Sequence, residues 1–219
     1  MNFDVITSYI PLYTEAFFLT IRIGWTGIGL ALFIGVFVAF AQHFRVPVLA
    51  RIAGIYVELF RNTPLLCQLF FLYFGLPKIG ITIPAETCGT LGLGLLGGSY
   101  MAEVFRSGLG SIPVTQEEGA LALGLTRRQM FTYVVFPEAL SLSVPGIVGN
   151  MIFLLKETSV FSAISLMDLM FTAKDLIGLY YNTTEALFLL VIFYIIMLLP
   201  VSVLGSILEN KVKIRTYGA

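Results

Sequence analysis

IGWTGIGLALFIGVFVAFAQ, residues 23–42, is an uninterrupted run that contains no Asp, Glu, Lys or Arg. A helix needs about 20 mostly apolar residues to cross the hydrocarbon core of a membrane. A second run of this kind, ALFLLVIFYIIMLLPVSVLGSIL, occupies residues 186–208. The first run lies too far along the chain, and has the wrong flanks, to be a cleaved signal peptide. Both runs therefore predict membrane-spanning helices.

The composition of the whole chain agrees with this prediction. Of its 219 residues, 58% are hydrophobic and only 12% are charged, and the mean hydropathy is +0.92. A soluble domain of this size cannot bury so much apolar surface. The cysteines, Cys67 and Cys88, match no metal or redox spacing and are expected to be small core residues. His43, the single histidine, is expected in a loop, and no metal site is predicted.

The remaining apolar runs complete an all-α integral membrane protein of about five transmembrane helices, in one domain over residues 1–219. The expected spans are roughly Tyr13–Gln42, Ile52–Leu76, Cys88–Phe105, Phe131–Leu155 and Ala186–Leu208. The third is rich in glycine, which predicts close helix contacts through small residues. The mixed segment 156–185 predicts short, partly interfacial helices, in which Asp168, Lys174 and Asp175 are expected to be ordinary loop charges.

The basic residues predict how the chain crosses the membrane. An odd number of spans places the two termini on opposite sides. Cytoplasmic loops are enriched in Lys and Arg, so the side with more basic residues is expected to be cytoplasmic. That side would hold Arg45, Arg51, Arg106, Arg127, Arg128, Lys211, Lys213 and Arg215, and the other side Lys78 and Lys174. The N-terminus is therefore expected outside and the C-terminus in the cytoplasm.

One charged stretch, EEGALALGLTRRQMFTYVVFPEAL over residues 117–140, interrupts this apolar chain. It belongs to a cytoplasmic loop at about 115–130. A first short helix is expected to end at Gly124, and a second to begin after Thr126, with Gln129 completing a capping box. The residues alone leave two interpretations open. The loop is either a rigid projection that binds another protein or an amphipathic hairpin on the lipid headgroups.

The same stretch carries a family resemblance. Glu118-Gly119-Ala120, then Gly124, then an apolar run ending in Phe136-Pro137, resembles the EAA loop of ATP-binding-cassette importer permeases. Gly119 stands where that pattern has alanine, a departure that weakens the helix rather than the surface. VELFRNTPLLCQLFFLYFGLP (57–77), GSYMAEVFRSGLGSIPVTQ (98–116) and LLKETSVFSAI (154–164) are similar to the corresponding segments of the polar-amino-acid subfamily. That subfamily includes histidine, glutamine, arginine and glutamate permeases, and the similarity spans roughly residues 10–212.

The resemblance implies a function and a set of partners. It implies a type I importer permease fold in a bacterial inner membrane, surrounded by lipid, with short cytoplasmic coupling helices. The partners would be a dimeric ATPase subunit, a second permease chain, identical or paralogous, and an extracytoplasmic binding protein that delivers a polar amino acid. No nucleic acid is expected. The implied coupling residues are Glu117, Glu118, Gly119, Ala120, Gly124, Arg127 and Arg128.

The chain itself is not expected to be an enzyme. It has no GxxxxGK[ST] phosphate-binding loop, so it cannot bind nucleotide by that route. ATP and Mg²⁺ would belong to the partner ATPase, and no cofactor is expected on this chain.

Charged residues inside the expected spans are costly and therefore face a cavity or a partner. Glu58 and Arg61 are three residues apart on one helix face, and Glu103 and Arg106 repeat that spacing. Such groups either form ion pairs that hold the bundle together or line the substrate path, where Arg61 could bind a carboxylate. Pro64 would break the second span and free the carbonyl of Phe60.

The candidate path residues come from two parts of the chain. Those in the second and third spans are Glu58, Arg61, Asn62, Thr63, Pro64, Gln68 and Glu103. Those that close the fourth span are Lys156, Glu157, Thr158 and Ser159. The family motif around the second group implies a gate or pocket wall, and charges at a helix end at the interface are the alternative explanation.

Three other functions fit the composition less well. A carrier driven by an ion gradient would show internal repeats with matching broken helices, and only one candidate break is present. A membrane scaffold or sensor could use the charged loop to bind another cytoplasmic protein. A membrane enzyme is the weakest alternative, since no nucleophile, base and orienting group cluster at a suitable spacing. The sequence specifies neither the amino acid nor whether the second permease is identical.

Overall fold

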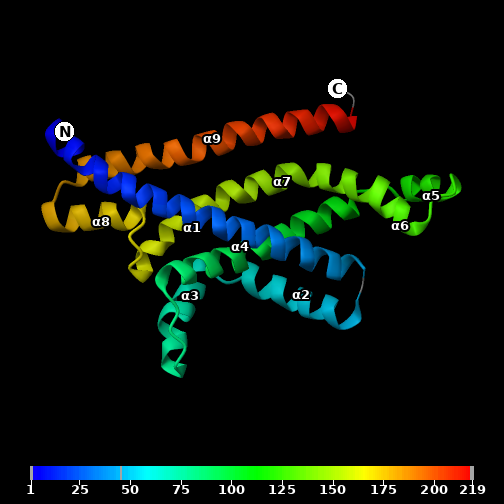
Figure 1. Cartoon of the computed structure of the whole chain (residues 1–219), viewed down its shortest axis with the longest axis horizontal. Helices are drawn as coiled ribbons and strands as arrows, with labels where there is room; N and C mark the ends of the chain where they lie inside the picture. The colour runs from blue at the N-terminus through cyan, green and yellow to red at the C-terminus, as the bar shows by residue number, and fades with distance from the viewer. Residues whose placement is uncertain (1, 45, 218–219) are drawn as a thin grey trace.

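The computed structural model describes residues 2–44 and 46–217, with side chains to residue 212. Every regular element in those ranges is helical (Figure 1). In chain order they are α1 (Phe3–His43), α2 (Pro47–Arg61), α3 (Leu65–Phe70), the π-helical turn η1 (Phe71–Gly75), the 3₁₀ turn η2 (Leu76–Ile79), α4 (Ala85–Gly110), α5 (Val114–Ala122), α6 (Arg127–Met130), the π-helical turn η3 (Phe131–Val135), α7 (Phe136–Glu157), the 3₁₀ turn η4 (Thr158–Ile164), α8 (Leu169–Tyr180) and α9 (Thr183–Tyr217). Arg45 lies outside the described residues, as do the side chains of Lys213 and Arg215.

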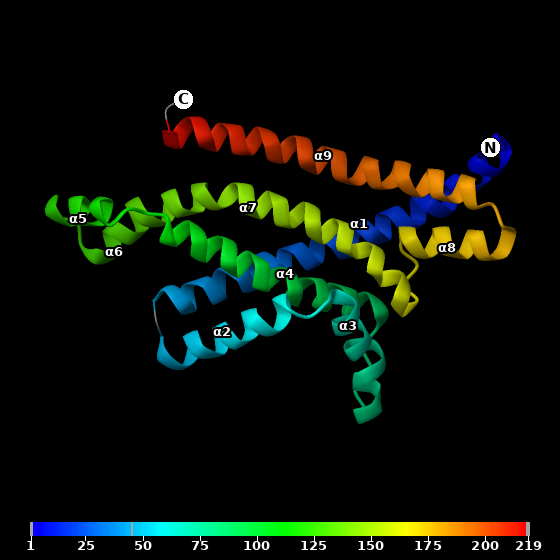
Figure 2. The same cartoon turned by 180° about the vertical axis from the view of Figure 1, so that it is seen from behind.

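The glycine-rich α4 lies at the centre of the bundle, against α1 on one side and α7 on the other (Figures 1 and 2). The predicted close contacts through small residues are confirmed. A Cβ added to Gly97 would lie 2.7 Å from the Cβ of Ala31 in α1 and 2.6 Å from Cδ1 of Leu154 in α7. Only a residue without a side chain allows three helices to approach this closely.

Three helical stretches among the described residues are long and apolar enough to cross a membrane alone, 3–43, 127–164 and 183–212. The first starts at Phe3 rather than near Tyr13. Asn2 is its N-cap, and the Asn2 side chain accepts a hydrogen bond from the amide of Asp4. The third contains the expected last span. With α4 and the α2–α3 segment, these helices agree with the prediction of about five spans.

The second expected span, Ile52–Leu76, is broken near Pro64, as the sequence predicted. The chain forms α2 up to Arg61, breaks at Asn62–Pro64, and resumes as α3. It also continues past Pro77 to Ile79. Proline has no N–H and its ring clashes with the carbonyl four residues earlier, so Pro64 ends the helix. The exposed side chain of Cys67, just after the break, also contradicts the expectation that this cysteine is a core residue, whereas Cys88 is buried.

The two π-helical turns share one cause. In η1 the amide of Leu76 donates to the carbonyl of Phe71, and Pro77 follows directly. In η3 the amide of Phe136 donates to the carbonyl of Phe131, and Pro137 follows directly. A widened turn absorbs the missing proline donor and the ring clash without stopping the helix. This explains why both helical paths continue through a proline.

The connection between η4 and α8 differs from the expectation of a loop with ordinary charges. Asp168 is fully buried, and its carboxylate accepts hydrogen bonds from the amides of Phe171 (3.0 Å) and Met170 (3.3 Å) as the N-cap of α8. Lys174 and Asp175 lie within α8 rather than in a loop. The short helices predicted for segment 156–185 are confirmed as η4 and α8.

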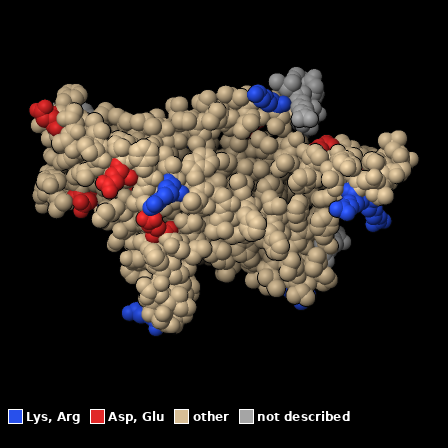
Figure 3. Space-filling view, in the orientation of Figure 1, with Lys and Arg blue, Asp and Glu red and all other residues tan. Residues whose placement is uncertain are grey.

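The molecule has two different ends along its longest axis. The N-terminus, α8 and the start of α9 lie at one end, and α5 and α6 lie at the other (Figures 1 and 2). On the face shown in Figure 3, acidic side chains gather toward the α8 end. The fold therefore separates the charged loop of residues 117–130 from the acidic end by nearly the full length of the bundle.

Candidate coupling surface and translocation path

The helix α5 ends in a glycine cap, as predicted. The amide of Leu125 donates to the carbonyl of Ala120 (3.2 Å), and that of Gly124 to the carbonyl of Leu121 (2.9 Å). Gly124 has φ +88°, in the left-handed region that favours glycine. These two bonds form a Schellman motif, which satisfies the last carbonyls of α5 and reverses the chain.

The capping box at Thr126 is also confirmed. The amide of Gln129 donates to Thr126 Oγ1 (3.3 Å), and the amide of Thr126 donates to Gln129 Oε1 (2.9 Å). The separate second short helix is wrong, however. From Arg127 the chain runs through α6 and η3 directly into α7, so that 127–164 forms one helical stretch. The loop is therefore a direct extension of the fourth span, which starts before Phe131.

Two side-chain contacts brace this extension. Gln116 Nε2 donates to Glu138 Oε1 (3.1 Å), which ties the first turn of α5 to the first turn of α7. Phe131 in η3 packs against Phe44 and His43, with ring centroids 5.2 and 5.7 Å away. His43 is the last residue of α1 rather than a loop residue. The hairpin of residues 114–135 is thus fixed to both α1 and α7, and sequence reasoning missed these contacts.

The predicted coupling residues are mostly on the surface. Glu118, Gly119, Gly124, Arg127 and Arg128 are exposed, Glu117 is half-buried, and Ala120 is buried. A Cβ at Gly119 would meet no atom within 4 Å, so the structure has room for the alanine of the EAA pattern.

The loop also exposes apolar side chains that sequence reasoning did not select. Leu123 is 86% exposed, next to Gly124, and Val114 and Tyr133 are exposed as well. An apolar side chain surrounded by charges on a rigid projection is the usual composition of a protein-binding surface.

The break between α2 and α3 leaves the last carbonyls of α2 without helical partners, and three side chains satisfy them. Asn62 Nδ2 donates to the carbonyl of Glu58 (2.7 Å), and Thr63 Oγ1 to that of Leu59 (2.8 Å). Gln68 Nε2 donates to the carbonyl of Phe60 (3.2 Å). The expectation that Pro64 leaves the Phe60 carbonyl spare is therefore wrong, because Gln68 occupies it.

Gln68 is a support of the break rather than a surface of the path. Its side chain is 8% exposed, and Nε2 also donates to the carbonyl of Thr63 (3.0 Å). One amide thus links the end of α2, the break and α3. Helix ends buried without such partners are costly, so the sequence Asn62-Thr63-Pro64, followed by Gln68, contains both the break and its caps.

An ion cluster links α2 and α4. Glu103 accepts two hydrogen bonds from Arg106, at 3.0 and 2.7 Å, and lies 3.4 Å from Nη1 of Arg61. The guanidinium of Arg61 lies 5.4 Å from the ring centroid of Tyr100. Glu58, the expected helical partner of Arg61, instead accepts a hydrogen bond from Asn62 (3.2 Å). The predicted spacing at Glu103 and Arg106 is therefore a real pair, whereas Arg61 pairs between helices.

The cluster continues to α7 through an aromatic contact. The rings of Tyr100 and Phe153 meet edge to face at 5.4 Å. Phe153 lies in α7, three residues before Lys156. The sequence analysis gave Tyr100 no role. Its position in the segment 98–116, which resembles the polar-amino-acid subfamily, could have selected it as a candidate.

The four predicted residues at the end of α7 lie in different surroundings. Thr158 is fully buried, and its Oγ1 donates to the carbonyl of Leu155 (2.7 Å), so it packs in the core instead of forming a wall. Lys156 is exposed and lines a hollow of about 550 Å³ between α7 and α9, with Tyr194 and Leu198. Glu157 and Ser159 are half-buried beside it.

A second hollow of about 550 Å³ lies between α1, α8 and the start of α4. An ion pair of Arg22 and Glu86 (2.6 Å) lines it, together with Glu15 and Asp175. Sequence reasoning gave no role to Arg22 or Glu86, which are far apart in the chain.

Comparison with known proteins identifies the architecture. Residues 5–214 match the family model described as "Binding-protein-dependent transport system inner membrane component". The chain belongs to this family. It is a multi-pass transporter subunit of an inner membrane, and in this family ATP hydrolysis is carried out by a separate ATPase.

Two relatives match nearly the whole permease. The glutamine transport system permease protein GlnP of Escherichia coli (strain K12) is 31% identical over 98% of this chain and 100% of its own length. The arginine transport system permease protein ArtQ of Bacillus subtilis (strain 168) is 29% identical over 97% of this chain and 98% of its own.

Solved structures support the same fold. A chain of the crystal structure of an amino acid ABC transporter with histidines superimposes with a TM-score of 0.90 and 29% identity, over 96% of this permease and 99% of that chain. A chain of the MetNI methionine ABC transporter in an inward-facing form gives 0.78, with 21% identity over 94% and 98% of the two chains. The second likeness concerns the fold alone. The type I importer permease fold expected from the sequence is thereby confirmed.

Proposed function

We propose that this permease lines the translocation path of an ATP-driven importer for polar amino acids. The observation that carries the proposal is the hairpin of residues 114–135, which is braced against α1 and continuous with α7. The relatives transport glutamine and arginine according to their names, which supports polar amino acids as the substrate class.

The hairpin would be the docking surface for a dimeric ATPase subunit. Leu123 would be its apolar anchor, and Glu118, Arg127 and Arg128 would form a charged rim. A rigid-body movement of the ATPase would then be transmitted along the axis of the 127–164 helix, because η3 joins α6 to α7 without a flexible link. ATP and Mg²⁺ would bind to the ATPase, since this sequence has no phosphate-binding loop.

The α5–α6 end of the bundle would face the cytoplasm, with the C-terminus on the same side and the N-terminus outside. Arg51, Arg127 and Arg128 near this end support that orientation. The opposite end, with α8 and the N-terminus, would receive the extracytoplasmic binding protein. A second permease chain, identical or paralogous, would complete the path.

The path would pass the ion cluster at the break between α2 and α3. An α-amino acid carries an ammonium and a carboxylate, which need acceptors and donors, respectively. Glu103 and Arg61 offer both on neighbouring helices, and Tyr100 adds an aromatic face for a cation. Asn62, Thr63 and Gln68 would keep this region in shape through their bonds to the main chain.

Purification of the tagged permease from its host membrane in mild detergent tests this function. We expect an ATPase subunit to copurify, and its activity in lipid to rise when a loaded binding protein is added. Gly124→Asp should abolish the stimulation, because the left-handed position and the docking surface are both lost. Gly119→Ala, on the same hairpin but in open space, is the matched control and should retain it.

A permease that purifies without any ATPase, and that transports in vesicles with an ion gradient alone, would contradict the proposal. A wild-type response in Gly124→Asp would contradict the coupling surface specifically.

A further inference from the structure

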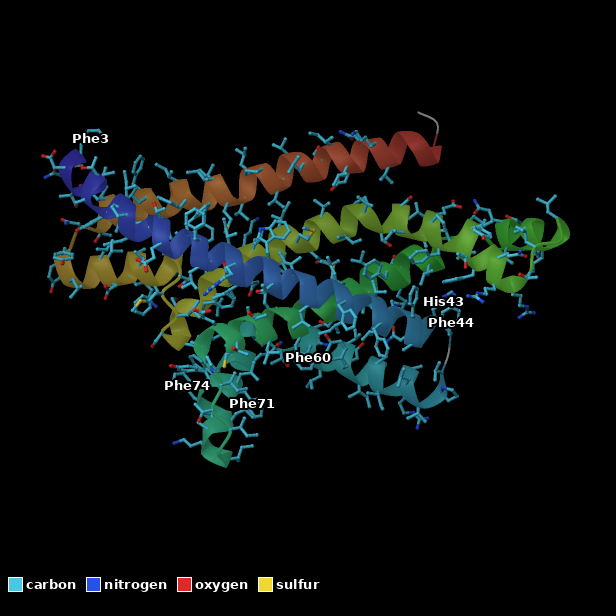
Figure 4. The ribbon with its side chains drawn as sticks, in the orientation of Figure 1. Phe3, His43, Phe44, Phe60, Phe71 and Phe74 are labelled. Carbon is cyan, nitrogen blue, oxygen red and sulfur yellow. The ribbon has the colours of Figure 1, made fainter. Side chains whose placement is uncertain are left out.

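The helices α7 and α9 enclose a groove of about 550 Å³ along one edge of the bundle. In both views α9 runs along that edge (Figures 1 and 2), and Figure 4 shows its side chains projecting outward. Among the described residues that line the groove, Lys156 in the last turn of α7 is the one charged residue. Apolar side chains form most of the remaining wall, from Ile152, Leu190, Val191, Ile195, Leu199 and Val203. The groove therefore combines one positive charge with a long hydrocarbon surface.

Lys156 has no anionic partner among residues 2–44 and 46–212. The ion pairs between described residues are all formed by arginine, and the adjacent Glu157 does not line the groove. A charged side chain in an apolar membrane environment is costly, and it faces a cavity or a partner. The groove therefore needs an anionic group from another molecule.

The wall of the groove fits lipid better than a second helix. Membrane helices approach one another through small residues, as α4 does with Gly97 against Ala31. Among the described lining residues of this groove, Ser202 is the only small one. In addition, α9 has no Asp, Glu, Lys or Arg between residues 186 and 208 that could pair with a partner helix. Bulky and branched walls suit a flexible hydrocarbon chain, which can follow their gaps.

The groove is long enough for one acyl chain. The end of α7 and the start of α9 lie at the same end of the bundle (Figures 1 and 2), so Lys156 lies toward the Leu190 end of the groove. From Leu190 to Val203 the helix rises about 20 Å, at about 1.5 Å per residue. One leaflet supplies about 15 Å of hydrocarbon. The flexible stem of Lys156 can also carry its ammonium toward the lipid head groups.

We propose that the groove between α7 and α9 binds an anionic phospholipid, with its phosphate on the Lys156 ammonium and one acyl chain along α9. A lysine ammonium has three donors and binds phosphate oxygens as a compact point charge. The lipid would cover the least buried of the three apolar spans, since 17% of the apolar window in 183–212 is buried, against 44% in 3–43 and 28% in 127–164. This site is separate from the proposed transport function and requires only that the chain lies in a membrane.

Native mass spectrometry of the purified permease, with any subunits that copurify, tests the site. The protein is titrated in detergent with phosphatidylglycerol, or with phosphatidylcholine that has the same acyl chains. We expect each permease chain to bind one phosphatidylglycerol more tightly than phosphatidylcholine. Lys156→Met should weaken phosphatidylglycerol binding roughly fivefold, the usual contribution of one lysine near an anionic lipid surface. Lys156→Arg should retain the binding.

Lys211→Met is the matched control, because Lys211 is an exposed lysine of α9 outside the groove. This variant should bind phosphatidylglycerol as the original protein does. Equal affinity of the original protein and Lys156→Met for phosphatidylglycerol would overturn the site. So would equal affinity of the original protein for the two lipids, a comparison that needs no variant.

A second pair of variants tests the position of the acyl chain. Ser202→Phe fills the groove and leaves Lys156 in place, and it should also weaken phosphatidylglycerol binding. Leu204→Phe is its control, because Leu204 is an exposed residue of α9 that does not line the groove. Equal binding in these two variants would contradict an acyl chain along α9.

Photo-crosslinking in native membranes distinguishes lipid from protein in the groove. The photoreactive amino acid p-benzoylphenylalanine replaces Ile195, which lines the groove and is 51% exposed. We expect adducts with phospholipid after irradiation. A covalent product with another protein chain would show that a partner covers the groove, and it would overturn the lipid site. None of these measurements depends on an attached ATPase, so their failure would leave the proposed function intact.

Discussion

The side-chain amide of Gln68 lies 3.2 Å from the carbonyl oxygen of Phe60, across the break that separates α2 from α3. This bond replaces the helical bond that the chain loses at Pro64. An unsatisfied buried carbonyl costs about 1–3 kcal/mol, so the break depends on a side chain eight residues along the sequence.

Replacement of Gln68 by leucine should therefore destabilise the permease by about 1–3 kcal/mol, since the carbonyls of Phe60 and Thr63 both lose a donor. Thermal unfolding in detergent, followed by intrinsic fluorescence at a fixed scan rate, measures the loss. Cys67→Ala is the control, because the Cys67 side chain is exposed. Equal thermal stability of the two variants would show that the amide does not support the break.

Gly124→Ala and Gly119→Ala should have opposite effects on stability. At Gly124, φ is +88°, where a side chain costs about 1–2 kcal/mol. At Gly119, inside α5, alanine gains about 0.5–1 kcal/mol of helix propensity and meets no neighbour within 4 Å. The unfolding temperatures of the two variants, relative to the original protein, measure this difference. An unchanged unfolding temperature in Gly124→Ala would mean that the glycine cap is not retained, and a fall in Gly119→Ala would mean that this position is not an open site within the helix.

The features that could be predicted from the sequence depend on residues close together in the chain. The charge-free run 23–42, the glycine cap at Gly124 and the Thr126–Gln129 box were all visible. Each follows from local rules for membrane helices and helix ends. The break at Pro64 was also visible as a proline signal.

The features that were missed depend on contacts between distant segments. Arg61 pairs with Glu103 on another helix because α2 packs against α4, and the spacing to Glu58 gave no sign of this. The brace between His43 and Phe131 likewise needs the ends of α1 and η3 to meet. The N-cap at Asp168 was an exception, since an aspartate before an apolar helix is a local signal that was available.

The ion cluster should matter more for transport than for folding. The Glu103 and Arg61 side chains are partly exposed, so their pairing contributes only about 0–1 kcal/mol to stability. Glu103→Gln should therefore unfold at nearly the original temperature, yet lose about tenfold or more in apparent substrate affinity if the carboxylate accepts a bond from the amino acid. Uptake of labelled substrate into proteoliposomes measures the affinity.

The matched control is Glu86→Gln, which removes the carboxylate of the Arg22 pair in the hollow near α8. This variant should transport normally. Unchanged uptake in Glu103→Gln would assign the cluster a structural role, and an equal loss in both variants would indicate a general effect of charge removal.

Asp168 should make the stability of the permease depend on pH. Burial raises the pKa of this carboxyl to about 7, although its bonds from Phe171 and Met170 oppose the shift. The folded state therefore holds the proton more tightly than the unfolded state, in which the pKa is the ordinary 3.8. The stability contributed by the protonated form is full below pH 3.8 and is lost as the pH rises toward about 7.

Asp168→Asn should remove this dependence, because an asparagine oxygen still caps α8 but does not titrate. The unfolding temperature of both proteins, measured in detergent between pH 5 and pH 8, gives the test, with the window chosen to bracket the pKa of about 7. We expect the original protein to lose stability relative to Asp168→Asn as the pH rises, and the difference to level off above the folded pKa. Lys174 and Tyr194 are the other titratable groups that interact with this carboxyl, so Lys174→Met serves as the control. A constant difference between the original protein and Asp168→Asn across the range would mean that Asp168 is already ionised at the lower limit and that its amide bonds outweigh its burial.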